Sequence, residues 1–171
     1  MFVCLLRGVN VNGIKIKNVE LKAVFESLGF TDVTPILQTG NVIYNTTISL
    51  NEQKDVIETA LRNKFGYEAF VIVCDGCEMQ TIINNYPFDL TGEMQPYVIF
   101  VNSDEVKQEL LALPIDENES VHHGNNVIYW TVPKGKTLDS KFGKVLGQKK
   151  YKSETTTRNL RTVEKIVTKI K

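Results

Sequence analysis

The chain has 171 residues, of which 42% are hydrophobic and 23% are charged, and its formal net charge is zero. This balance is typical of a globular protein, with enough length for one large domain or two compact halves. No apolar run approaches the ~20 residues of a membrane span, and the N-terminus lacks a signal-peptide pattern. We therefore expect a cytoplasmic protein with no membrane association.

The first half of the chain alternates strand and helix signals. A polar loop over residues 8–17 follows the first strand, and Asn18 is the expected cap of the first helix, which Gly29 closes. A hairpin is expected around Thr39-Gly40, and a second helix follows Asn51 and ends at Gly66. The predicted strands are 2–7, 32–38, 41–45 and 69–74, and the predicted helices are 18–28, 52–65 and 78–85.

The second half repeats this order of elements after a linker. Ser103 is the expected cap of its first helix, and a hairpin is expected around Gly124-Asn125. The predicted strands are 97–102, 120–123, 126–132 and 151–156, and the predicted helices are 104–113, 138–146 and 157–170. We therefore divide the chain into halves at residues 1–86 and 96–171, with 87–95 as linker, although the halves are also compatible with one compact unit.

A repeated tetrapeptide supports an internal duplication. Asn41-Val42-Ile43-Tyr44 recurs as Asn126-Val127-Ile128-Tyr129 in the second hairpin. The order β-α-β-β-α-β in each half predicts an α+β protein of two tandem ferredoxin-like units, with antiparallel sheets of strand order 4-1-3-2. Because residues 3–6 and 70–73 are continuously apolar, the helix-free face of the first sheet should also be buried, against the other half or the second copy of a homodimer.

Polar side chains gather where this fold brings the ends of the first and second strands together. Two glycines in the loop allow close approach to the backbone, an arginine offers a planar donor fork, and no acidic residue occurs before Glu20. The corner therefore has the character of an anion-binding site at the start of a helix. The alternative is that its amides only satisfy turn backbone groups while the arginine pairs with an acid. The candidate ligand-binding residues here are Arg7, Asn10, Lys15, Lys17, Gln38, Thr39 and Asn41.

These residues also resemble a known family. Leu5–Val11, the Leu28-Gly29-Phe30 that ends the first helix and the segment Leu37–Val42 are similar to the bacterial family catalogued as domain of unknown function 1697, with its patterns LLRGINVGG, LGF and QSGNV. Further similarity lies in Thr157-Arg158-Asn159 near the C-terminus. The resemblance implies a two-part α+β fold but carries no activity.

The resemblance also singles out Arg158 and Asn159 as candidate ligand-binding residues. In the duplicated order they open the final helix, where free backbone N–H groups and a guanidinium coincide. We hypothesise that Arg158 meets Arg7 and completes a two-arginine anion site.

Charge is unevenly distributed along the chain. Residues 134–171 hold twelve Lys and Arg against three Asp and Glu, a net charge of +9. This asymmetry is compatible with a nucleic-acid surface, and Tyr44 and Tyr129 could stack on bases. The alternatives are that the basic segment packs near the acidic stretch 104–119 and that both tyrosines belong to the core.

The remaining chemistry-bearing residues give weaker signals. Cys74-Asp75-Gly76-Cys77 is formally a CxxC, interpreted as a strand-to-helix turn with buried, reduced thiols, and redox chemistry is the alternative. His122 and His123 are neighbours on a strand and should point to opposite faces, so they cannot easily share a metal. No metal site or cofactor is predicted.

Three functions follow from these observations. The leading hypothesis is a module that binds a small anionic or phosphorylated ligand at the polar corner. The second is binding of nucleic acid, RNA in particular, through the basic C-terminal third. The third is an enzyme with an anionic substrate, although no catalytic constellation is recognised because no general base is evident.

Overall fold

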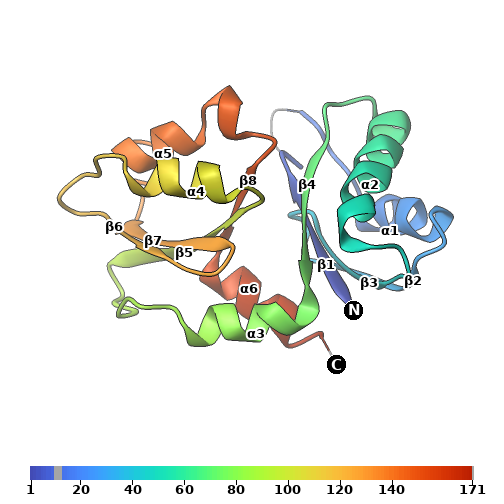
Figure 1. The fold of residues 1–171 in the computed structure, drawn as a ribbon, viewed down its shortest axis with the longest axis horizontal. Coiled ribbons are helices and arrows are strands. Elements are labelled where there is room, and N and C mark those ends of the chain that lie inside the picture. The colour runs from blue at the N-terminus through green and yellow to red at the C-terminus, as the bar shows by residue number, and fades with distance from the viewer. Residues whose placement is uncertain (10–12, 171) are drawn as a thin grey trace. The chain divides into compact units, whose positions relative to one another are not determined.

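A computed structural model describes residues 1–9 and 13–170. Its elements run twice through the order β-α-β-β-α-β-α, which confirms the predicted fold class of two similar α+β halves (Figure 1). The chain forms two compact units, one made of Met1–Met79 with Lys165–Lys171 and the other of Gln80–Glu164. Within the described residues, no helix is both long and apolar enough to span a bilayer.

The first unit contains a four-stranded antiparallel sheet in the order β2-β3-β1-β4, which is the predicted order. Its elements are β1 (Phe2–Arg7), α1 (Asn18–Ser27), β2 (Thr31–Ile36), β3 (Asn41–Asn45), α2 (Leu50–Phe65), β4 (Phe70–Asp75) and the first residues of α3 (Gly76–Asn84).

The two helices of this sheet differ from the predictions at their starts. Asn18 does not cap α1. Lys17 is the cap residue, its backbone N–H lies 3.3 Å from the Glu20 carboxylate, and the Asn18 amide donates to the Leu37 carbonyl at 2.8 Å. Helix α2 begins at Leu50, before the predicted Asn51, and ends as predicted at Gly66, whose φ of 65° suits a residue without Cβ.

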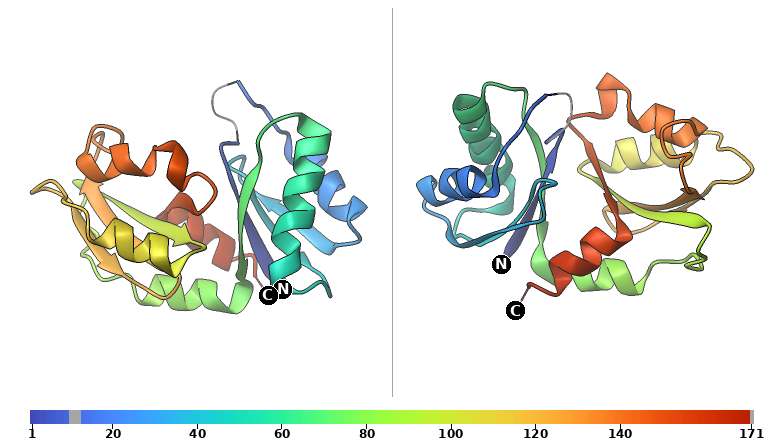
Figure 2. Two further views of the ribbon diagram at one scale, coloured as in Figure 1. Left: turned by 45° about the horizontal axis from the view of Figure 1, so that its top comes forward. Right: turned by 180° about the vertical axis from the view of Figure 1, so that it is seen from behind.

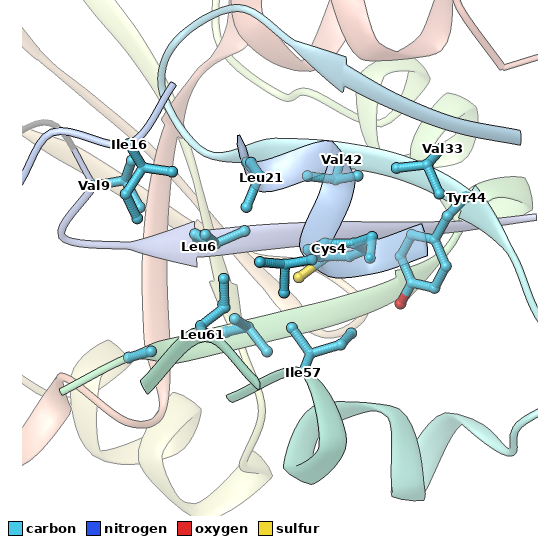
Figure 3. Packing of buried hydrophobic residues seen from close by; sticks show 14 of the residues in the cluster. Cys4, Leu6, Val9, Ile16, Leu21, Val33, Val42, Tyr44, Ile57 and Leu61 are labelled. Carbon is cyan, nitrogen blue, oxygen red and sulfur yellow. The ribbon is translucent and has the colours of Figure 1, made fainter. Parts of the chain in front are cut away.

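Helices α1 and α2 cover one face of the first sheet. Cys4, Leu6, Val42 and Tyr44 point toward these helices and form the core with side chains that include Phe25, Ile57 and Leu61 (Figure 3). The opposite face is buried as well. Val3, Leu5 and Ile43, which alternate with the core residues along β1 and β3, are at most 2% exposed. The expectation that both faces of this sheet are buried is therefore confirmed.

The second unit contains an antiparallel sheet in the equivalent order β6-β7-β5-β8, with α4 and α5 packed on one face (Figure 2). Ser103 caps α4 as predicted, because its hydroxyl accepts from the Val106 N–H at 3.3 Å. The elements are the last residues of α3, β5 (Met94–Val101), α4 (Asp104–Leu111), β6 (Ser120–His123), β7 (Val127–Pro133), α5 (Lys141–Leu146), the 3-10 helix η1 (Lys149–Tyr151), β8 (Thr155–Asn159) and the first residues of α6 (Leu160–Val167).

The last strand and helix lie later in the chain than predicted. Strand β8 spans Thr155–Asn159, and α6 begins at Leu160 rather than at Thr157. Three consecutive threonines, which are β-branched, favour the strand, and Arg158 pairs with Val98 of β5. Arg158 and Asn159 therefore end a strand, and the prediction that they open the final helix is wrong.

The repeated tetrapeptide is not structurally equivalent in the two halves. In the first sheet Tyr44 and Val42 point toward the helices, whereas in the second sheet Ile128 and Trp130 do so. Tyr129 consequently faces the other side of its sheet. A shift of one residue exchanges the faces of a strand, so the match is displaced by one position, and the duplication rests on the order of elements.

Candidate anion-binding corner

The end of β1 and the β2–β3 turn meet in the first unit, as the sequence predicts. The Leu6 N–H donates to the Gly40 carbonyl at 2.7 Å. A Cβ atom added at Gly40 would lie 2.8 Å from the Leu6 Cβ and 3.2 Å from a Val9 methyl group. With a φ of 72°, Gly40 permits both the turn and this close approach. The two segments that carry the candidate residues are thus fixed against each other.

The residues of the β2–β3 turn fall into two groups. Asn41 is 1% exposed, and its amide donates to the Ile36 carbonyl at 3.0 Å and lies 2.8 Å from the Thr39 hydroxyl. Asn41 thus satisfies a backbone group of the turn, which is the alternative that the sequence left open for the amides of the corner. Gln38 and Thr39 are exposed at the tip of the turn. The turn therefore presents two polar side chains over a rigid, internally bonded base.

The loop after β1 is anchored by apolar side chains. Val9 and Ile16 are 8% and 4% exposed, and both belong to the core cluster, where they lie at one end beyond Leu6 (Figure 3). Lys15 and Lys17 flank Ile16 and are exposed. Asn10, the remaining candidate of this loop, lies outside the described residues. The buried isoleucine between them places the two lysines outward from the core.

Arg7, the last residue of β1, is half-buried. Burial lowers the pKa of its guanidinium because the low-dielectric surroundings disfavour the charged form. An arginine in a protein nevertheless keeps its charge at neutral pH. In the alternation of β1, Arg7 follows Val3 and Leu5 on the face away from α1 and α2, whereas Ile16, which lies between the two lysines, belongs to the core on the helix side. Glu20 accepts from the backbone N–H of Lys17.

Arg158 and Asn159 belong to the second unit, and both side chains form hydrogen bonds within residues 156–161. Arg158 is 8% exposed, and its Nη1 donates to the Thr156 hydroxyl at 2.9 Å and the Thr157 carbonyl at 3.0 Å. The Asn159 Oδ1 accepts from the Arg161 N–H at 2.9 Å and so caps α6. The two-arginine site with Arg7 stays a prediction.

Part of the basic C-terminal third pairs with the acidic stretch. Lys150 forms an ion pair with Glu109 on α4, and Lys141 lies 3.4 Å from Asp116. Hydrogen bonds from Lys150 and Tyr151 lower the pKa of Glu109. These pairs follow the alternative in which basic and acidic segments pack together.

The tyrosines proposed as stacking platforms are core residues. Tyr44 is fully buried, with its hydroxyl 2.6 Å from the Gln53 amide oxygen, and Tyr129 is 3% exposed. Neither ring is accessible to a base.

The cysteine and histidine predictions need correction. Cys74 lies in β4 and is buried, but Cys77 on α3 is exposed. Helix α3 begins at Gly76, and the Asp75 carboxylate accepts from the Cys77 N–H at 2.9 Å. His122 and His123 do not diverge, because their ring centroids lie 4.8 Å apart and the rings are stacked. Among the described residues, no group of three or more His, Cys, Asp or Glu is arranged to hold a metal.

Comparison with known proteins agrees with this architecture. A solved structure entitled "The structure of conserved bacterial protein SP0830 from Streptococcus pneumoniae" matches with a TM-score of 0.82 and 19% identity, over 99% of this chain and 97% of that one. No curated protein matches the sequence. Residues 1–129, which include the whole polar corner, match the family described as "Protein of unknown function (DUF1697)". The chain therefore belongs to the DUF1697 family.

Proposed function

We propose that the chain binds a small anionic ligand, of the phosphate or carboxylate type, at the corner formed by the end of β1 and the β2–β3 turn. The proposal is supported by the half-buried Arg7 at the end of β1, next to a turn whose backbone is fixed by Gly40 and Asn41. A partly desolvated guanidinium binds an oxyanion through paired, charge-assisted hydrogen bonds.

The surroundings of Arg7 support the same chemistry. Lys15 and Lys17 add exposed positive charge in the loop that follows β1, and Gln38 and Thr39 supply neutral donors at the tip of the neighbouring turn. Because the turn is held by internal hydrogen bonds, little conformational entropy is lost when a ligand binds. The ligand is expected to be small, with its charged end toward Arg7.

Calorimetric titration with inorganic phosphate at about pH 8, where free imidazoles are neutral, tests the proposal. Charge-assisted hydrogen bonds contribute about 1.5–3 kcal/mol, so Arg7→Gln should weaken binding by about 10- to 100-fold. Arg7→Lys keeps the charge but loses the planar fork and should restore only part of the affinity.

The lysines are tested by the double variant Lys15→Gln/Lys17→Gln. Two solvated charges at up to about 1 kcal/mol each should account for a further loss of several-fold. Lys22→Gln/Lys64→Gln, which removes the same charge from α1 and α2, is the matched control and should bind like the parent protein. Equal affinity of the parent, the Arg7 variants and the double variant would refute the proposed site.

A further inference from the structure

A polar cavity lies in the unit formed by Gln80–Glu164. Its volume is ≈ 400 Å³, within the range of small-molecule sites. Asn85, which follows α3, and Lys107 on α4 form two of its walls, and the end of the β6–β7 hairpin from His122 to Asn125 forms a third. The residues that line it include no aspartate or glutamate.

The two imidazoles lie on the same side of the hairpin. Consecutive residues of a regular strand point to opposite faces, yet the rings of His122 and His123 are stacked with an interplanar angle of 26° and a centroid separation of 4.8 Å. Both side chains are exposed. Each neutral ring offers one donor and one acceptor, whereas a protonated ring offers two donors. Two adjacent cationic rings repel each other, and an anion beside them offsets this repulsion.

Lys107 supplies a permanent positive charge to the same cavity. Its side chain is 13% exposed, and its Nζ donates to the Gly124 carbonyl at 3.4 Å and lies 2.8 Å from the Asp104 carboxylate. An ammonium has three donors, so one further hydrogen bond to a ligand is compatible with these contacts. Because Asp104 is 81% exposed, solvent screens its attraction for the lysine.

The floor of the cavity is rigid. Gly124 packs so closely that an added Cβ would lie 2.6 Å from a Val127 methyl group and 2.7 Å from the Tyr129 ring. The Tyr129 hydroxyl donates to the Ile82 carbonyl at 3.0 Å and ties β7 to α3. The hairpin end that carries the histidines therefore rests on a fixed base, which lowers the conformational cost of binding.

We propose that this cavity is a second, pH-dependent anion site, which takes a doubly charged oxyanion of the phosphate type, free or as a monoester, when the histidines are protonated. Asp104, Lys107 and Tyr129 are the other titratable groups at the cavity. Burial raises the pKa of Tyr129, which stays neutral. Carboxylates and ammonium groups ordinarily titrate well outside the range of about pH 5 to 8, in which unperturbed histidine changes charge. The affinity should thus increase as the pH falls through the histidine range.

The chain contains only two histidines, so its imidazole NMR signals report on this cavity alone. Sulfate is the first probe, because its charge is constant in this range and any pH dependence belongs to the protein. We expect saturating sulfate to raise the apparent pKa of the imidazoles, and sulfate affinity to fall, as the pH rises, by up to about tenfold per pH unit for each proton taken up on binding.

Ribose 5-phosphate, as a second probe, distinguishes the source of the anion. Tighter binding than that of sulfate at the same pH supports a phosphate monoester, and equal binding supports a free oxyanion. If neither probe changes the pKa values of the imidazoles, the proposal is overturned.

Variants separate the contributions of the side chains. His122→Gln/His123→Gln should abolish the pH dependence of sulfate binding measured by calorimetry. Lys107→Gln should weaken binding at pH 5.5 by about 2- to 10-fold, the effect of losing one hydrogen bond of ordinary strength from an ammonium that Asp104 also holds. Lys149→Gln, which removes an exposed charge elsewhere in the unit, is the matched control. Unchanged imidazole responses to sulfate in Lys107→Gln would count against the site. Arg7→Gln leaves these responses intact, so this proposal and the polar corner fail independently.

Discussion

The substitution Gly40→Ala tests how the polar corner is held together. Gly40 has a φ of 72°, and its carbonyl accepts from the Leu6 N–H. An alanine Cβ at this position would lie 2.8 Å from the Leu6 Cβ and 3.2 and 3.3 Å from two atoms of Val9. Both neighbours are buried, so neither can turn its side chain toward solvent. The change therefore adds backbone strain and steric crowding at one position.

The size of the effect follows from these two contributions. A left-handed conformation costs a residue with a Cβ about 1–2 kcal/mol relative to glycine. Excess volume in a packed core costs about 1–3 kcal/mol. We therefore expect Gly40→Ala to lower the free energy of unfolding by about 2–5 kcal/mol, a large share of the 5–15 kcal/mol that is typical of a folded domain.

Gly66→Ala isolates the steric contribution. Gly66 has a similar φ of 65°, but no atom lies within 4 Å of an added Cβ, so only the backbone cost of about 1–2 kcal/mol remains. Urea unfolding followed by circular dichroism compares the variants at equal m-values. Circular dichroism reports on both units, whereas Trp130, the one tryptophan of the chain, lies in the second unit. Equal destabilisation by the two substitutions would refute the close contact of the β2–β3 turn with Leu6 and Val9.

Three further predictions concern stability and binding. Asn41→Ala should cost about 1–3 kcal/mol, because a buried carbonyl loses its donor, and thermal unfolding would contradict this if the midpoint did not change. Hydrogen bonds from Lys150 and Tyr151 lower the pKa of Glu109 in the folded state. The contribution of this carboxylate to the free energy of unfolding is therefore complete above the unfolded pKa of about 4.3, and it is lost as the pH falls through the lowered pKa of the folded state. Lys150→Gln should therefore flatten the acid side of the stability–pH curve, whereas an unchanged curve would exclude the pair. If residues 134–171 bind RNA, the affinity should fall steeply with salt, and salt-independent or absent binding in a filter assay would eliminate that function.

The order of strands and helices could be predicted because it depends on local patterns. Apolar periodicity, Ser103 as a cap and Gly66 as a helix end all act within a few residues. The face of the sheet to which each side chain of a strand points is harder to predict, because a shift of one residue reverses it. The identical tetrapeptides that begin at Asn41 and Asn126 therefore indicated the correct strands in the wrong register, and only the packing of Tyr44 and Trp130 under the helices shows the displacement.

The candidate sites illustrate the same division between local and long-range information. The meeting of the β1 end with the β2–β3 turn could be predicted because the topology brings these two strand ends together; the anion site at this corner stays a prediction. The cavity at His122 and His123 could not be predicted. Side chains alternate between faces only in a regular strand, and His123 is the last residue of β6 before the turn, where this rule no longer fixes the side of the ring. Lys107, which forms another wall, comes from α4 and is placed there by the contact of its Nζ with the Gly124 carbonyl. A charge contributed by a distant helix leaves no pattern in the sequence, so sites of this kind emerge only after the fold is known.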